Sequence, residues 1–431
     1  MLSVFRRQAS SVAAAIVLAA FLYVAFRSFV WLWEVPAVVR IVPAASGFQL
    51  TRNGQPYFIK GAGGEGSRET LVRAGGNSIR TWDTKNLKAV LDEAQRLGLT
   101  VTVGFWLGHE RHGFSYNDSR QVTAQADEVR ETVERFKQHP AVLIWALGNE
   151  MEGRGDNAAI WLAVNRLARS VKRLDPNHPT MTVVADIRGD KVKQFHRLCA
   201  DIDLLGINSY AMAASVPQRY RDAGGTKPYI LTEFGPAGTW ESEKNSWGLV
   251  PEATSTEKAE MYRETYRQAV ATQPGRCLGS YAFLWGAKQE VTATWFGILL
   301  PDETRLGAAD VLTELWTGKP PVNLCPRIDR IEVIGSDEVD PQAVVRVTLE
   351  TSDPEKDPLK VLWKLQKESE TFGQGGDEEA VPPEFPEAIV NGDLKGAELK
   401  LPKDKASYRV FAYVTDDHGG GAVANVPIRV K

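Results

Sequence analysis

The chain is poor in cysteine and histidine, and it has no excess of basic over acidic residues. Three cysteines and six histidines occur among 431 residues, and no CxxC pair is present, which argues against a structural zinc site. The net charge is -3 at pH 7 and no run of Lys and Arg occurs, which argues against nucleic acid as a partner. No metal and no other cofactor is expected. Tryptophan, by contrast, is abundant, with twelve copies.

The N-terminal segment reads as a membrane anchor. Arg6 and Arg7 precede nineteen residues without charge (8–26), and Trp31 and Trp33 follow. Roughly 20 apolar residues span a bilayer as a helix, and Trp favours the interface. We predict an uncleaved transmembrane anchor over residues 1–34 and a Pro/Ala-rich linker over 35–47. A cleaved signal peptide is the alternative. Either reading places the remainder on the extracytoplasmic, periplasmic side.

Residues 48–319 alternate short apolar runs with amphipathic helical stretches. The eight runs are "YFIKGAG", "GGNSIRTW", "GLTVTVGFW", "AVLIWALGNE", "PTMTVVAD", "DLLGINSY", "PYILTEFG" and "LGSYAFLW". Strands alternating with helices imply a parallel sheet, and eight repeats in this length predict a (β/α)₈ TIM barrel. A doubly wound open sheet is the alternative. It calls for a glycine-rich phosphate turn, and "GAGGEGS" lacks the required spacing.

Residues 320–431 form a second unit with a different periodicity. "AVVRVTLETSD", "LKVLWKLQ" and "YRVFAYVTDD" alternate in period two without intervening helical patterns, which predicts an antiparallel β-sandwich. "TSDPEKDPLKVLWKL" and "VTDDHGGGAVANVPIRV" resemble Ig-like and cadherin-like modules of extracytoplasmic bacterial proteins. We interpret their Asp clusters as solvated turn residues in preference to a Ca²⁺ site.

Two carboxylates directly follow strongly apolar strands. Glu150 ends the fourth run and Glu233 lies in the seventh. In a TIM barrel, active-site residues project from the carboxyl ends of strands. Burying a carboxylate there is costly unless partners compensate. Cleavage of a glycosidic bond needs such a pair, one to protonate the leaving oxygen and one to attack the anomeric carbon or activate water.

The two strand ends carry a specific resemblance. "WALGNE" and "LTEFG" are similar to the strand-four and strand-seven signatures of glycoside hydrolase clan A. "FQLTRNGQPYFIKGAGG" and "GGNSIRTWD" resemble the opening of the barrel in family-two glycoside hydrolases. The resemblance implies a retaining glycosidase in which Glu150 is the general acid/base and Glu233 is the nucleophile.

The same resemblance implies roles for four further residues. Asn149 would bond the 2-hydroxyl of the sugar, and Tyr210 would touch the nucleophile. Arg80 would keep the nucleophile ionised. Trp285 would be the strand-eight aromatic under the sugar at the cleavage point.

Trp106 and His109, which follow the third run, complete the predicted substrate-binding set. An aromatic face at Trp106 suits the apolar face of a pyranose ring, and His109 is either structural or in contact with substrate. Trp240, Trp247 and Trp295 are further candidate platforms. Short barrel loops favour an open cleft and hence an oligo- or polysaccharide as substrate.

One departure leaves the sugar undetermined. Family-two enzymes carry β-sandwich domains before the barrel, whereas here the sandwich follows it. We expect a β-glycoside hydrolase or transglycosylase acting by double displacement. A non-catalytic carbohydrate-binding or scaffold component of a polysaccharide synthesis or export system is the alternative, although binding alone does not need an acid and a nucleophile together.

Overall fold

The computed structural model describes residues 36–370, 373 and 376–431. The predicted anchor at residues 1–34 lies outside the described residues. In the part of the chain that is described, no helix combines the length and apolar character needed to cross a membrane.

A small antiparallel sheet covers the N-terminal end of the barrel. It comprises β1 (Val39–Ala44), β2 (Gly47–Arg52) and β3 (Gln55–Pro56). Asn53 and Gly54 form the turn between β2 and β3 with φ of 52° and 78°, the left-handed pair that Asn-Gly favours in a two-residue hairpin. Val39 and Leu50 pack with the residues that fill the barrel from this end. The carboxyl ends of the strands therefore remain free to form a site.

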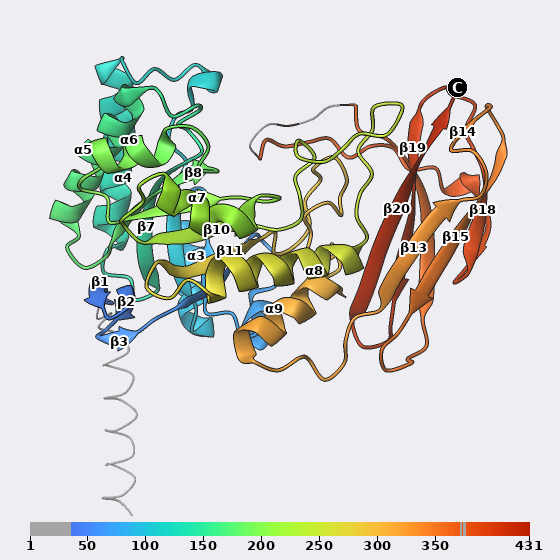
Figure 1. The fold of residues 1–431 in the computed structure, drawn as a ribbon, viewed down its shortest axis with the longest axis horizontal. Coiled ribbons are helices and arrows are strands. Elements are labelled where there is room, and N and C mark those ends of the chain that lie inside the picture. Colours follow the sequence, from blue (N-terminus) through green and yellow to red (C-terminus); the bar gives the residue numbers. More distant parts are fainter. Residues whose placement is uncertain (1–35, 371–372, 374–375) are drawn as a thin grey trace, which may run out of the picture.

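Eight parallel strands close into a barrel, which confirms the predicted TIM barrel (Figure 1). Each strand corresponds to one of the eight apolar runs. In spatial order they are β10 (Tyr229–Phe234), β11 (Cys277–Phe283), β4 (Ile59–Gly63), β5 (Ser78–Arg80), β6 (Thr100–Phe105), β7 (Val142–Asn149), β8 (Thr180–Ala185) and β9 (Leu204–Asn208). The strands are almost wholly buried because helices cover the outer face.

The helices lie between successive strands. They are α2 (Arg68–Arg73), α3 (Leu87–Leu97), α4 (Ser119–Phe136), α5 (Ala158–Leu174), α6 (Lys191–Leu198), α7 (Val216–Asp222), α8 (Ser255–Thr265) and α9 (Gly307–Thr317). Side-chain caps fix several of their starts. Asn157 accepts from the backbone of Ala159 at α5, and Thr254 forms a reciprocal capping box with Glu257 at α8.

Two further sheets follow the barrel. One contains β13 (Arg327–Val333), β15 (Val344–Ser352), β18 (Gly396–Lys400) and β17 (Ile389–Asp393). The other contains β12 (Arg305–Leu306), β20 (Gly420–Val430), β19 (Ser407–Thr415) and β16 (Lys360–Lys367), with β14 (Glu338–Val339) beside β20. Most pairings are antiparallel, as predicted, and both sheets contribute to one apolar core.

The sheets are joined tightly to the barrel. Figure 1 shows α8 and α9 extending from the barrel toward the C-terminal sheets, and α8 contacts β13 and β20. The short strand β12, which precedes α9, pairs with β20. Arg409 is buried at this junction, where it bonds Glu368 at 2.6 Å and the backbone oxygen of Val250 at 2.7 Å. The C-terminal sheets are thus packed against the loops that follow the barrel strands.

Candidate active site

The end of β7 is shaped by left-handed backbone. Gly148 has φ 86° and Glu150 has φ 53°, and the pairing with β8 shifts register between Ala146 and Asn149. The φ of Gly148 is one that residues with a side chain rarely adopt, which favours glycine there. The Glu150 N–H donates to Val183 at 3.0 Å. These features turn the strand end toward the barrel axis and place Asn149 and Glu150 beside the residues of β9.

Glu233 lies on β10 and is 6% exposed. Its Oε1 accepts from Arg80 Nη1 at 2.8 Å and from Trp82 Nε1 at 2.8 Å, and its Oε2 accepts from the Tyr210 hydroxyl at 2.6 Å. Three directed donors satisfy the acceptors of a buried carboxylate and hold it in one orientation. The predicted contacts of Arg80 and Tyr210 with Glu233 are therefore present.

Arg80 connects the two strand ends that carry the carboxylates. Besides Glu233, its Nη1 donates to the backbone oxygen of Thr232 at 2.9 Å, and its Nη2 donates to Asn149 Oδ1 at 2.6 Å. The guanidinium is almost fully buried. Asn208 Nδ2 also donates to Asn149 Oδ1, at 3.2 Å. Because Oδ1 has two donors, the Asn149 amide is oriented with its own N–H groups available to a ligand.

Glu150 occupies a different environment from Glu233. The pKa of Glu150 is raised to about 7, because burial and the neighbouring Glu233 carboxylate outweigh the opposing hydrogen bond from Asn208. That bond runs from Asn208 Nδ2 to Glu150 Oε1 at 2.6 Å. A carboxyl group with such a pKa can give up and take back a proton near neutral pH. Glu150 can thus act as a proton donor, whereas Glu233 is a carboxylate held by three hydrogen-bond donors.

The structure places Trp285, the predicted strand-eight aromatic, in the core and places Phe283 beside the carboxylate cluster. Trp285 is 2% exposed, donates from Nε1 to Ser67 at 2.9 Å and lies 6.4 Å from the Trp316 ring. It belongs to the core between barrel and helices. Phe283, the last residue of β11, is the aromatic beside the cluster, with its ring 5.9 Å from Tyr210 and 5.8 Å from Trp82. The strand ends at Phe283, so strand alternation no longer governs where Trp285 points.

Trp106 and His109 lie together after β6. Their rings stack at 4.7 Å, and Trp106 is 40% exposed whereas His109 is 3% exposed. Burial and the nearby Arg111 and His112 lower the pKa of His109 to about 4, so the ring is neutral at physiological pH. A cavity of about 370 Å³ adjoins both residues. Trp106 is thus an exposed aromatic face, and His109 is the buried ring that supports it.

The other candidate tryptophans divide in the same way. Trp240 is 63% exposed and its ring lies 5.6 Å from Tyr210, at the edge of the carboxylate cluster. Trp295 is 3% exposed and donates from Nε1 to Ala237. Trp240 is therefore available as a sugar platform, and Trp295 serves packing.

Four residues of the cluster were outside the predicted set. Trp82 and Phe283 contribute aromatic surface, Asn208 orients Glu150, and Glu290 lies near Glu233. Three of these, Trp82, Asn208 and Phe283, lie at or just after the ends of barrel strands, a position that carried the signal. Glu290 follows the strand by seven residues, so only the folded loop brings it to the cluster.

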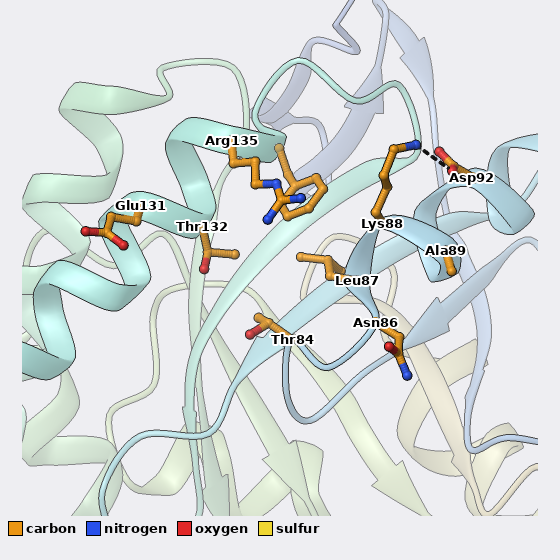
Figure 2. Close-up of a pocket in the computed structure, with 10 residues that line it drawn as sticks. Thr84, Asn86, Leu87, Lys88, Ala89, Asp92, Glu131, Thr132 and Arg135 are labelled. Carbon is orange, nitrogen blue, oxygen red and sulfur yellow. Dashed lines mark hydrogen bonds and ion pairs between the residues drawn. The ribbon is translucent and has the colours of Figure 1, made fainter.

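Two other features lie away from the carboxylate pair. A groove of about 580 Å³ runs between α3 and α4 on the outside of the barrel (Figure 2). Lys88 and Asp92 form an ion pair at 2.7 Å in its wall, and none of the predicted site residues lines it. In the C-terminal sheets, carboxylates of Asp353, Glu355 and Asp357 lie within 4.8 Å of one another.

Comparison with known proteins agrees with the predicted barrel. Residues 76–272 match the family model of glycosyl hydrolases family 2, TIM barrel domain. The β-glucuronidase of Paenibacillus borealis is 28% identical over 230 residues, covering 44% of this chain and 37% of that protein. The β-glucuronidase of Homo sapiens is 26% identical over 200 residues, covering 41% of this chain and 28% of that protein.

Solved structures show the same fold. The β-glucuronidase of Lactobacillus rhamnosus superimposes with a TM-score of 0.51 at 21% identity, covering 66% of this chain and 53% of that one. That of Dictyoglomus thermophilum gives 0.50 at 19% identity, covering 66% and 54%. The chain matches 37% and 28% of the length of the two curated relatives. The matched part of the barrel, residues 76–272, is thus similar to the TIM barrel domain of glycosyl hydrolases family 2.

Proposed function

We propose that this chain is a retaining β-glycosidase or transglycosylase. In the first step the Glu233 carboxylate attacks the anomeric carbon, while Glu150 gives its proton to the departing glycosidic oxygen. The product is a glycosyl ester on Glu233. In the second step Glu150 takes a proton from water or from a sugar hydroxyl, whose oxygen then displaces Glu233 from the anomeric carbon.

The observation that carries this proposal is the contrast between the two carboxylates. The pKa of Glu150 is raised to about 7 by burial and by Glu233, which suits a proton donor at neutral pH. Glu233 is fixed by Arg80, Trp82 and Tyr210, which suits a nucleophile. Two carboxyl groups with such different environments are the recurring arrangement for glycoside cleavage.

The hydrogen-bond donors around the two carboxylates are suited to stabilising the transition state. Burial and the nearby Glu233 keep the pKa of Tyr210 well above its usual value, so the phenol remains a donor to Glu233. The free N–H groups of Asn149 point from the same strand end as Glu150 and are suited to the 2-hydroxyl of the sugar. A hydrogen bond there strengthens as the transition state forms.

Substrate and location are further parts of the proposal. The exposed faces of Trp106 and Trp240 support an oligo- or polysaccharide as substrate, because aromatic faces stack on pyranose rings. The uncharged segment 8–26 supports an enzyme anchored in the membrane and acting on its extracytoplasmic side. The period-two strands of residues 320–431 support an Ig-like module after the barrel.

The test uses the full chain and aryl β-glycosides. Glu233→Gln should abolish turnover and prevent the accumulation of a covalent glycosyl-enzyme from a 2-fluoro glycoside, read by mass spectrometry. Glu150→Ala should be slow but rescued by azide, with a β-glycosyl azide as product. Glu243→Gln, the same change at an exposed carboxylate, should behave as wild type. Normal turnover by Glu233→Gln would rule out the mechanism, and sugar binding without any wild-type turnover would favour the scaffold alternative.

A further inference from the structure

The segment that follows β11 forms a wall of the candidate site. Val291, Trp295 and Phe296 pack in one apolar cluster with Tyr210 and Phe283. Tyr210 bonds the proposed nucleophile, so this cluster directly adjoins the carboxylate pair. The segment 288–296 therefore borders the carboxylate cluster.

Two side chains of this wall carry acceptor oxygens that lack a hydrogen-bond donor. Gln289 Oε1 and Glu290 Oε2 are buried and unpaired among the described residues. The Gln289 amide is oriented because its Nε2 donates to the Val291 oxygen at 3.0 Å. Glu290 retains 18% exposure of its side chain, and its nearest cation, Lys288 Nζ, lies 3.8 Å away. Buried acceptors without donors are costly, and a ligand that brings donors relieves that cost.

The C-terminal sheets hold this wall in place. Val291 has φ 61°, a left-handed conformation that a β-branched residue rarely adopts. Its N–H donates to Glu379 Oε2 at 2.7 Å, and the other oxygen of Glu379 accepts from Gly373 at 2.8 Å. Glu379 is 7% exposed and comes from the loop between β16 and β17. It is a positioning residue for Glu290.

Charge at the wall is predominantly negative. The pKa of Glu290 is raised to about 7, because burial and the carboxylates of Glu233 and Glu379 outweigh the opposing effect of Lys288. The nearby cations are already engaged. Arg80 bonds Glu233 and Asn149, and Lys288 donates to Gly376 at 2.7 Å. The wall thus presents acceptors and negative charge.

We propose that Gln289 and Glu290 bind hydroxyl groups of an uncharged sugar and that Glu290 excludes uronic acids. This inference rests on the proposed function and specifies its substrate class. A sugar hydroxyl donates a hydrogen bond and satisfies the unpaired oxygens, whereas a uronate carboxylate only accepts and is repelled by Glu290. The site thereby differs from what the names of its β-glucuronidase relatives suggest.

The test compares aryl β-glucoside, β-galactoside and β-mannoside with aryl β-glucuronide on the full chain at pH 8, above the pKa of Glu290 near 7, so that this carboxylate is ionised. We expect the best neutral substrate to exceed the glucuronide in kcat/KM by at least about tenfold, the effect of one charge-dependent interaction. Glu290→Gln should raise KM for the neutral substrate about tenfold with little change in kcat, and should narrow its advantage over the glucuronide.

A further variant tests whether Glu379 positions Glu290, with Glu243→Gln again as the control. Glu379→Ala removes the acceptor for Val291 and should raise KM in the same direction as Glu290→Gln, whereas Glu243→Gln should leave KM at the wild-type value. If the wild-type enzyme preferred the glucuronide, or if Glu290→Gln left KM unchanged, the inference would be overturned. The proposed function would stand in both cases. Absence of Glu233-dependent turnover on every substrate would instead overturn the proposed function, and the inference with it.

Discussion

Asn208 offers a direct test of how the structure sets the acidity of Glu150. Its Nδ2 donates to Glu150 Oε1 at 2.6 Å. This bond opposes burial and Glu233, and with it in place the pKa of Glu150 is about 7. The bond stabilises the charged carboxylate, so its removal in Asn208→Ala must move the pKa upward. In the proposed mechanism Glu150 acts as an acid, and the alkaline limb of the pH profile follows its pKa.

The magnitude follows from the strength of one charge-assisted hydrogen bond. Such a bond contributes about 1.5–3 kcal/mol, and one pKa unit corresponds to about 1.4 kcal/mol. Water replaces part of the lost bond, so we expect a shift of about one unit. The alkaline limb of kcat/KM should therefore move from near pH 7 to near pH 8 in Asn208→Ala.

The assay is the pH dependence of kcat/KM on an aryl β-glycoside. Ser209→Ala is the matched control, because the Ser209 hydroxyl donates to Asp186 and its removal should leave the limb in place. Burial also raises the pKa of Glu290 to about 7, so the shift must persist when Asn208→Ala is combined with Glu290→Gln. A limb that stays in place or moves to lower pH in Asn208→Ala would refute the assignment of Glu150 as the acid.

Two stability predictions concern residues outside the carboxylate pair. Arg409→Met leaves the buried Glu368 carboxylate without its partner and should lower the free energy of unfolding by about 3–5 kcal/mol in a denaturant titration. Adding Glu368→Leu should recover part of that loss. If the two substitutions instead lowered the free energy of unfolding additively, the pairing would be contradicted. Trp285→Phe removes the hydrogen bond to Ser67 and should lower the free energy of unfolding by about 2 kcal/mol. KM should stay within about twofold of wild type because the ring lies in the core. A large increase in KM would show that Trp285 contacts substrate.

The barrel and its carboxylates were readable from the sequence because the signals are local. A strand covered by helices has to be apolar along its length, so "VLIWALGNE" and "YILTEFG" predict both the strand and its polar end. In a TIM barrel the strand ends meet at one rim, so the closeness of Arg80, Asn149 and Glu233 followed from strand order. The structure shows the predicted contact of Arg80 with Glu233 and adds a bond from Arg80 to Asn149.

The aromatic and the wall of the site were not readable in this way. Phe283 and Trp285 are two residues apart, and the choice between them depends on where β11 stops and how the chain then turns. Glu290 is brought to Glu233 by a loop, and that loop is held by Glu379 from a distant part of the chain. Contacts between residues so far apart in sequence leave no periodic pattern.

The sequence by itself determined the eight-stranded barrel, the sheets that follow it and the placement of Glu150 and Glu233, since each depends on hydrophobic periodicity and on strand ends. Only the tertiary structure decided which side chains surround those carboxylates. Burial and the neighbouring charge set the acidity of Glu150. Three donors at or just after the ends of β5 and β9 orient Glu233. Such effects depend on distances between separate elements, which the folded chain alone defines.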